Sequence, residues 1–289
     1  MLLELTFTGA YDWPLALRMI GAHAVPGGEV TDQVTRTHRR LLPGAAGPLI
    51  VTVAPDADRI AVQVEGGGAT VTESDAADVT RRVRHWLDLD LDPATMSATF
   101  GDDRILGPLV RERPGLRRVR YPDSFEAVIS TVLGQQVSLA AARTFAGRLV
   151  AAYGEAGPGG LTAFPAPERL AATELEELRS AIGITGSRAR TLLAVAELFA
   201  RTDPWPLPLP PEQWDERAAA LLAVPGIGPW TRDYLRLRLF GDPDAVPVGD
   251  LVLRRVLGVA KDRDVPTAMA RWRPQRSYAV FQLWASTAW

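Results

Sequence analysis

The 289-residue sequence contains no cysteine, only three histidines and a single lysine among its 32 basic residues. Without cysteine, the chain can form no disulfide, thiolate zinc site, cysteine-held iron–sulfur cluster or cysteine nucleophile. His23, His38 and His85 all lie in the first third of the chain and are too few for a histidine-rich metal centre. Schiff-base chemistry is confined to Lys261 or the N-terminal amine.

The sequence also lacks an apolar run of about 20 residues, so no transmembrane helix is expected. Its first fifteen residues contain neither a basic segment nor a small-residue cleavage site. No secretory signal is therefore expected, and the cytoplasm is the default location. With 47% apolar and 23% charged residues the chain can bury a core. Its length predicts one to three domains, since a domain typically has roughly 100–200 residues.

Charge is unevenly distributed along the chain. The net charge of −2 by itself argues against a nucleic-acid partner. Residues 1–110, however, carry 9 basic and 15 acidic side chains, whereas residues 111–289 carry 23 and 19. Residues 111–120 hold five arginines against one glutamate. Such asymmetry indicates either an anionic partner for the second part or simply a solvated basic face.

Hydrophobic patterning predicts an α+β protein, with antiparallel strands confined to the first ninety residues and helices after about residue 95. The predicted strands cover residues 3–7, 49–54, 59–64 and 69–73, the last three as a meander. Helices are predicted at 14–24, 76–89 (capped by Ser74 or Asp75), 124–133, 138–153 (capped by Ser138), 167–181, 187–201 and 211–223. The Pro-rich residues 203–211 predict a stiff, extended connector.

The most informative motif is Pro225-Gly226-Ile227-Gly228, between a helix predicted to end at Val224 and a helix predicted to begin at Pro229. Two glycines at this spacing permit positive φ and leave backbone N–H groups uncovered at a helix N-terminus. That arrangement binds phosphate through the orphan N–H donors and the helix dipole. An ordinary corner between two helices uses glycine in the same way.

Asp250 lies twenty-two residues after Gly228, at the start of another apolar-periodic segment. In isolation this position is typical of a helix N-cap. The segment 221–231, however, is similar to the helix–hairpin–helix of the DNA glycosylase superfamily, whose members place an essential aspartate about twenty residues beyond the hairpin. The resemblance therefore implies a catalytic role for Asp250. Lyase-type members carry a lysine where this chain has Trp230, and many hold a four-cysteine cluster. The resemblance is thus to the monofunctional branch.

Within that branch the chain resembles the DNA-3-methyladenine glycosylase II family, the AlkA type. The matching segments are Tyr11-Asp12-Trp13, residues 123–154, the hairpin and residues 272–289. The resemblance implies an N-terminal αβ domain (1–92) and two mostly helical subdomains that face each other across a cleft. One subdomain, residues 93–117 and 243–289, carries the catalytic aspartate. The other, residues 118–242, carries the hairpin motif at about 212–239.

The family pattern implies a site in which a flipped base is held between aromatic rings. It places Trp230, Tyr234 and Trp284 in the base pocket, although aromatics at helical spacing are more commonly core residues. Met19 and His23 fall at positions near the pocket where the family has an aromatic and an arginine; a surface or packing role is the alternative for His23. Gln136 occupies the position of the side chain that fills the gap left by the flipped base, commonly a leucine.

The hairpin is implied to bind one DNA phosphate through Gly226, Gly228 and Thr231. The carbonyls of Leu222, Val224 and Ile227 are implied to hold a structural monovalent or divalent cation, and no cofactor is required for catalysis. Arg254 and the arginines of residues 111–120 are further candidates for phosphate contacts. We expect a monomeric enzyme that hydrolytically excises alkylated bases, of the 3-methyladenine and 7-methylguanine type, from double-stranded DNA in base excision repair. The alternatives are a non-catalytic DNA-binding protein and a glycosylase for deaminated or oxidised bases.

Overall fold

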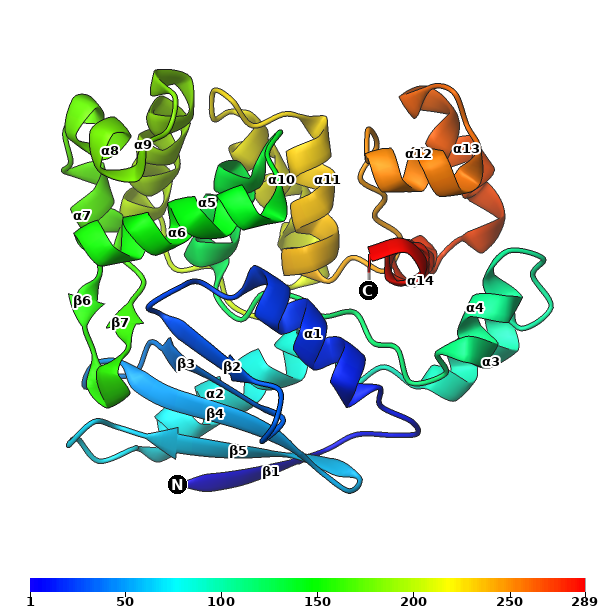
Figure 1. The fold of residues 1–289 in the computed structure, drawn as a ribbon, viewed down its shortest axis with the longest axis horizontal. Helices are drawn as coiled ribbons and strands as arrows, with labels where there is room; N and C mark the ends of the chain where they lie inside the picture. Colours follow the sequence, from blue (N-terminus) through cyan, green and yellow to red (C-terminus); the bar gives the residue numbers. More distant parts are fainter. Residues whose placement is uncertain (289) are drawn as a thin grey trace.

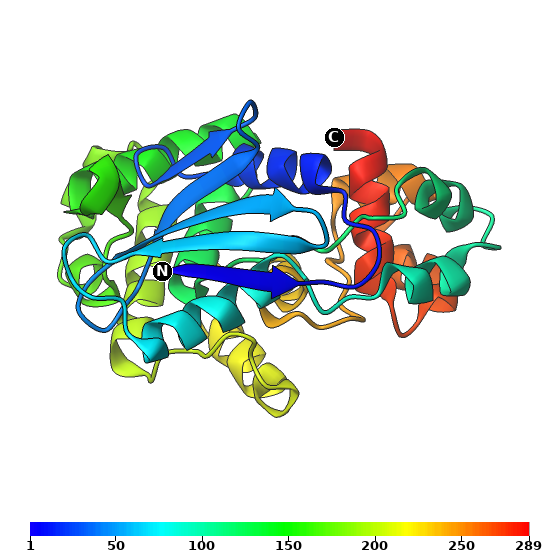
Figure 2. The ribbon, with the colours of Figure 1, turned by 90° about the horizontal axis from the view of Figure 1, so that it is seen from below.

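A computed structural model describes residues 1–288 and places an antiparallel sheet beneath a layer of helices (Figure 1). The sheet has the strand order β1-β5-β4-β3-β2, with every neighbouring pair antiparallel, so β1 and β2 are its edges. Figure 2 shows the five strands as one continuous layer. The strand bounds are β1 (Leu2–Thr6), β2 (Glu29–Asp32), β3 (Thr37–Leu42), β4 (Leu49–Asp56) and β5 (Arg59–Glu65).

Two helices pack on this sheet, and side-chain caps fix where each begins. In α1 (Trp13–His23), Asp12 accepts the Leu15 N–H at 3.0 Å. In α2 (Glu73–Trp86), Thr72 and Asp75 form a reciprocal capping box. Helix α1 contacts β2, β3 and α6 (Leu139–Tyr153), so it lies between the sheet and the helical layer. This position brings one face of α1 to the site described below.

The predicted α+β class is confirmed, with three of the four predicted strands and both N-terminal helices present. The prediction of a strand over residues 69–73 is wrong. Ala69 makes only isolated bridges to Gly66 and Gly67. Thr72 is instead the N-cap of α2, because its hydroxyl and the Asp75 carboxylate satisfy two backbone N–H groups at the start of the helix.

Strands β2 and β3 were not predicted, because their sequences, EVTD and THRRLL, are mostly polar and only Leu41 and Leu42 at the end of β3 are both apolar and buried. His38 and Arg40 on β3 are buried, and both form ion pairs with Glu29 on β2. Arg40 also pairs with Glu126 in the helical layer. Burial raises the pKa of Glu126 to about 8. Over the rest of this hairpin the ion cluster takes the place of the apolar side chains by which a strand is usually recognised.

The helical layer contains most of the remaining chain. The predicted helix over 167–181 is two helices, because the backbone at Glu174, the N-cap of α8, is extended (φ −70°, ψ 142°). The other four predicted helices beyond residue 95 are present within a few residues. The bounds are α3 (Pro93–Phe100), α4 (Leu106–Glu112), α5 (Ser124–Gly134), α6 (Leu139–Tyr153), β6 (Glu155–Ala156), β7 (Thr162–Ala163), α7 (Pro167–Ala171), α8 (Leu175–Ile182), α9 (Gly186–Arg201), α10 (Trp214–Leu222), α11 (Pro229–Leu235), a π-turn η3 (Arg236–Phe240), α12 (Leu251–Leu257), α13 (Val265–Ala268) and α14 (Arg276–Ala288).

The buried apolar side chains form two large clusters. One joins the sheet and its helices to α3, α4 and the C-terminal helices α12–α14. The other holds α5–α11 together and includes Trp205, Leu207 and Leu209, by which the Pro-rich connector is anchored. Helix α1 contributes mainly to the first cluster, whereas α11 contributes to the second. The division into three domains remains a prediction. No helix in residues 1–288 is long and apolar enough to cross a membrane.

Candidate base-binding and DNA-binding site

A cavity of about 400 Å³ lies where α1, α5 and α6 meet α11, α12 and α14. Six residues singled out from the sequence line it, although they come from four separate helices: Met19, His23, Trp230, Tyr234, Asp250 and Trp284. Its volume is within the range of small-ligand pockets. The fold therefore brings together the one carboxylate and the three aromatic rings that were predicted to act on a base.

The aromatic rings form a continuous wall rather than a core. Trp230 and Tyr234, one helical turn apart on α11, stack with centroids 5.1 Å apart and planes 23° apart. Trp284 on α14 continues the wall, 5.9 Å from Tyr234. All three rings are only partly buried. Such faces stack on planar ligands and attract cations.

Asp250 is both the N-cap of α12 and part of the cavity lining. Its Oδ1 atom accepts the Leu253 N–H at 2.9 Å, and the Trp284 indole N–H lies 3.3 Å from the same oxygen. Gly249, with φ of +98°, turns the chain immediately before it. The capping interpretation and the site interpretation are therefore compatible, because one carboxylate oxygen holds the helix while the group faces the cavity.

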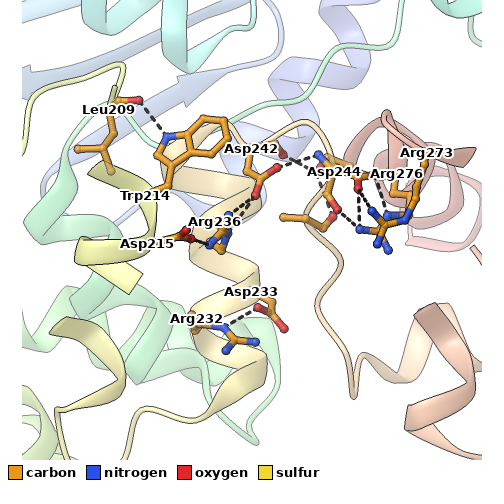
Figure 3. A network of polar contacts seen from close by, with 12 residues as sticks. Leu209, Trp214, Asp215, Arg232, Asp233, Arg236, Asp242, Asp244, Arg273 and Arg276 are labelled. Carbon is orange, nitrogen blue, oxygen red and sulfur yellow. Dashed lines mark hydrogen bonds and ion pairs between the residues drawn. The ribbon is translucent and has the colours of Figure 1, made fainter. Parts of the chain in front are cut away.

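A network on the far side of α11 ties the hairpin region to the segment that carries Asp250 (Figure 3). Arg236 in η3 pairs with Asp215 of α10 at 2.7 Å and with Asp242 at 2.9 Å. Two residues further on, Asp244 pairs with Arg276 at the start of α14 at 2.7 Å. These contacts link η3, which continues α11, to the start of α14, and α11 and α14 carry the aromatic wall.

The hairpin itself packs closely on α9. Gly226 has φ of +93°, and a Cβ atom there would lie 2.1 Å from Thr191 Oγ1, so only glycine fits. A Cβ on Gly228 would meet nothing within 4 Å, and its φ is −103°. Gly228 is the N-cap of α11 and no side chain caps this helix. Its first N–H groups therefore lack a side-chain acceptor, as an anion site requires.

Gln135, which sequence reasoning did not single out, braces this hairpin. Its side-chain amide donates to the Gly226 carbonyl at 3.1 Å and to the Thr231 hydroxyl at 2.9 Å. Thr231 is 3% exposed, so its backbone N–H, rather than its buried hydroxyl, is the candidate for phosphate binding. The neighbouring Gln136 is exposed, has φ of +55° and lies between Gly134 and Val137, which both line the cavity.

Met19 and His23 bring α1 to the cavity. Met19 is buried, and its carbonyl lies 2.8 Å from His23 Nδ1. Burial and the positive charge of Arg238 lower the pKa of His23 to about 4. The imidazole is therefore neutral at pH 7, and its Nδ1–H donates to the Met19 carbonyl.

Sequence reasoning missed Tyr121, Arg143 and Arg238, which also line the cavity. Arg238 extends the i, i+4 series of Trp230 and Tyr234, and this spacing could have revealed it. Tyr121 follows the basic segment directly. Burial raises the pKa of its phenol far above the usual range, so the hydroxyl stays protonated.

The prediction that arginines of residues 111–120 contact phosphates is wrong for three of the five. Arg118 and Arg120 are buried and form ion pairs with Asp88, each at 2.8 Å. Arg117 is 2% exposed and donates to backbone carbonyls, among them those of Thr8 and Leu91. These three arginines brace the interior, because Asp88 pairs with two of them and backbone carbonyls accept hydrogen bonds from the third.

The hairpin carbonyls were implied to hold a cation. The Val224 carbonyl accepts the Ile227 N–H at 3.1 Å, which leaves it one lone pair for a metal. Leu222 is 38% exposed at the end of α10. Within residues 1–288, no group of three or more histidine or carboxylate side chains could hold a metal ion. Any cation at the hairpin would therefore depend on backbone oxygens, and this site remains a prediction.

Comparisons with known proteins agree with this arrangement. Residues 2–123 match the model of the AlkA N-terminal domain, and residues 129–268 match that of the HhH-GPD superfamily base excision DNA repair protein. A Mycobacterium tuberculosis protein, "Probable bifunctional transcriptional activator/DNA repair enzyme AlkA", is 39% identical over 92% of this chain, but the chain spans only about half (53%) of that relative. "DNA-3-methyladenine glycosylase 2" of Escherichia coli is 29% identical, covering 96% of this chain and 95% of that one. The structure of a 3-methyladenine DNA-glycosylase from Archaeoglobus fulgidus has the same fold, with a TM-score of 0.80, 21% identity and coverage of 99% and 98% of the two chains.

Proposed function

The chain belongs to the HhH-GPD superfamily of base excision DNA repair proteins, with an AlkA N-terminal domain, and from this premise we propose that it is a monofunctional DNA glycosylase. It would flip alkylated bases out of duplex DNA and excise them by hydrolysis. The observation that carries the proposal is the cavity in which Asp250 lies beside Trp230, Tyr234 and Trp284, next to an uncapped hairpin helix.

The first step is DNA binding and base flipping. The N–H groups of Gly228 and of the first turn of α11 would hold one backbone phosphate, an interaction independent of sequence. A base inside a duplex cannot be reached, so it must rotate out of the stack into the cavity at a cost of a few kcal/mol. Gln136, exposed at the cavity rim, would enter the gap left in the duplex.

The aromatic wall would then select the damaged base. Bases alkylated at ring nitrogens, such as 3-methyladenine and 7-methylguanine, carry positive charge, and stacked electron-rich rings attract cations. The same charge makes the base a good leaving group, so one carboxylate can suffice. This matches the cavity, where Asp250 is the single acidic side chain in the lining.

The chemical step would be hydrolysis of the N-glycosidic bond. As the bond from C1′ to the base nitrogen breaks, its electron pair leaves with the base and the sugar becomes oxocarbenium-like. Asp250 would stabilise this developing positive charge and orient or deprotonate the water that adds to C1′. The free oxygen of its carboxylate is available, because within the described chain only Oδ1 accepts hydrogen bonds.

The absence of lyase activity belongs to the same proposal. A lyase needs an amine at C1′. The lyase-type lysine position holds Trp230, and Lys261, the only lysine, does not line the cavity. The sugar would therefore be left as an abasic site with both strands intact.

Mass spectrometry of bases released from duplex DNA carrying mixed lesions tests this proposal. We expect free alkylated bases, strand breaks only after alkali, and no covalent complex trapped by borohydride. Duplex affinity without any base release would instead indicate a non-catalytic DNA-binding protein. A borohydride-trapped complex would contradict the monofunctional assignment, and release of only deaminated or oxidised bases would contradict the proposed substrate class.

A further inference from the structure

Arg238 carries a buried positive charge that no carboxylate among the described residues neutralises. Its side chain is 3% exposed, and no carboxylate oxygen in residues 1–288 lies within 4.0 Å of it. The buried residues Arg40, Arg118 and Arg120 each have a carboxylate partner, and Arg117 donates to several backbone carbonyls. Arg238 differs from all four. An isolated charge is costly to bury, so its N–H donors need an acceptor.

Aromatic rings hold the guanidinium at the cavity wall. The Cζ atom lies 5.0 Å from the ring centroid of Tyr121, 5.7 Å from that of Tyr234 and 5.8 Å from that of Phe281. Nη1 donates to the Tyr234 hydroxyl at 3.2 Å, whereas the buried Nε–H has no acceptor among the described residues. Arg238, Tyr121 and Tyr234 all line the cavity. The guanidinium is therefore fixed in place with donor capacity left over.

A guanidinium presents only donors, so it distinguishes bases by their exocyclic groups. The 6-oxo group of guanine-type and hypoxanthine-type purines is an acceptor, whereas the 6-amino group of adenine-type purines is a donor. We propose that Arg238 is a specificity-determining residue that donates to the 6-oxo group of a flipped purine, so that the site favours 6-oxopurines, such as 7-methylguanine and hypoxanthine, over 6-aminopurines. This inference rests on the proposed glycosylase function.

The surroundings of Arg238 support this role. His23 is neutral beside it, so the imidazole adds no further positive charge next to the guanidinium. Asp250 lines the same cavity without pairing to Arg238, so the two charges are free to act on different parts of a nucleotide. A 6-amino group facing Arg238 would leave donors on both sides without an acceptor, and unmatched buried donors are penalised strongly.

The test measures 7-methylguanine and 3-methyladenine released in the same reaction from methylated duplex DNA, with hypoxanthine-containing duplex as a second 6-oxopurine. The variant is Arg238→Met, which keeps much of the side-chain volume and removes all donors. We expect release of 7-methylguanine and hypoxanthine to fall about tenfold or more, the size of a lost charged hydrogen bond. Release of 3-methyladenine should stay within about twofold of the wild type or rise.

Two further variants keep the result interpretable. Arg143→Met removes the other arginine of the cavity lining, which is exposed, and should lower release of all bases by a common factor. Arg238→Lys keeps the charge but loses the planar guanidinium. Its ratio of 6-oxopurine to 6-aminopurine release should lie between those of the wild type and Arg238→Met. Unfolded protein lowers all rates equally, so the ratio is unaffected by partial misfolding. An unchanged ratio of 6-oxopurine to 6-aminopurine release in both Arg238 variants would overturn the inference. Failure of the wild type to release any base would overturn the proposed function itself.

Discussion

The indole N–H of Trp284 lies 3.3 Å from Oδ1 of Asp250, the same oxygen that accepts the Leu253 N–H at 2.9 Å. Two donors thus fix one oxygen of the carboxylate, and its other oxygen is left to face the cavity. Trp284 therefore serves both as part of the aromatic wall and as a positioning residue for Asp250.

This relationship predicts that Trp284→Phe keeps the ring but releases the carboxylate. We expect the single-turnover rate of base release at saturating enzyme to fall about tenfold, the size of one lost hydrogen bond to a charged group. Trp13→Phe is the matched control, because it removes an indole N–H that donates to the Arg36 carbonyl at 2.9 Å, and neither residue lines the cavity. Equal rates for the two variants would show that the contact to Asp250 has no positioning role.

The two hairpin glycines should respond differently to alanine. Gly226→Ala must place a Cβ 2.1 Å from Thr191 Oγ1 at a positive φ, so we expect at least about 2 kcal/mol lower stability in urea unfolding. Gly228→Ala has open space and ordinary φ, so its stability should change by less than about 1 kcal/mol. Its DNA affinity should nevertheless fall, since the methyl group enters the proposed phosphate site. Unchanged duplex affinity in Gly228→Ala would contradict phosphate binding there.

Adjacent glutamines are predicted to have separate roles. Gln136→Ala should slow release from a paired lesion several-fold but not from the same lesion in single-stranded DNA, where no gap is opened. Gln136→Leu, a more apolar wedge, should match or exceed the wild type. Gln135→Ala removes the brace on Gly226 and Thr231 and should weaken binding to both kinds of DNA. Equal loss on paired and single-stranded substrates in Gln136→Ala would exclude the wedge role.

His85 should make the fold less stable in acid. Burial and the charge of Arg120 lower the pKa of His85 to about 3, whereas the unfolded chain titrates near 6.5. The unfolded state therefore binds more protons below pH 6.5, and stability falls as pH falls towards 3. His85→Gln lacks the buried imidazole and therefore lacks this pH dependence. The unfolding free energy of the wild type minus that of His85→Gln should fall by about 2 kcal/mol between pH 7 and pH 5. An advantage of the same size at both pH values would contradict the assigned burial effect.

The sequence predicts helices and strands well where their buried face is apolar and poorly where it is polar. Helices with clear caps and apolar periodicity, such as those begun by Asp12 and Ser138, were predicted within one or two residues. Strands β2 and β3 were not, because Glu29, His38 and Arg40 occupy much of their buried face, and apolar residues are buried only at Leu41 and Leu42. One partner in this cluster, Glu126, lies 86 residues after Arg40 in sequence, and local patterns do not report such contacts.

The candidate site shows the same division. Asp250 and the aromatic residues were predicted from a motif with fixed spacing, which the structure places around one cavity. Arg238 was overlooked because an arginine on a helix is usually exposed, and only packing of Tyr121 and Phe281 on both sides buries it. The predicted phosphate contacts of the arginines at 117, 118 and 120 were wrong because their partners, Asp88 and several backbone carbonyls, lie 26 or more residues away in sequence and could not be assigned to them.

The most direct test of the account is the single-turnover release of 3-methyladenine and 7-methylguanine from methylated duplex DNA by the wild type and by Asp250→Asn. Asparagine caps a helix about as well as aspartate, so α12 and the fold should persist. Asp262→Asn, which alters an exposed carboxylate paired with Arg254 outside the cavity, is the matched control and should act like the wild type. We predict that Asp250→Asn binds duplex DNA but releases both bases about 10²–10⁴-fold more slowly. Release at the wild-type rate would contradict the assignment of Asp250 as the catalytic residue.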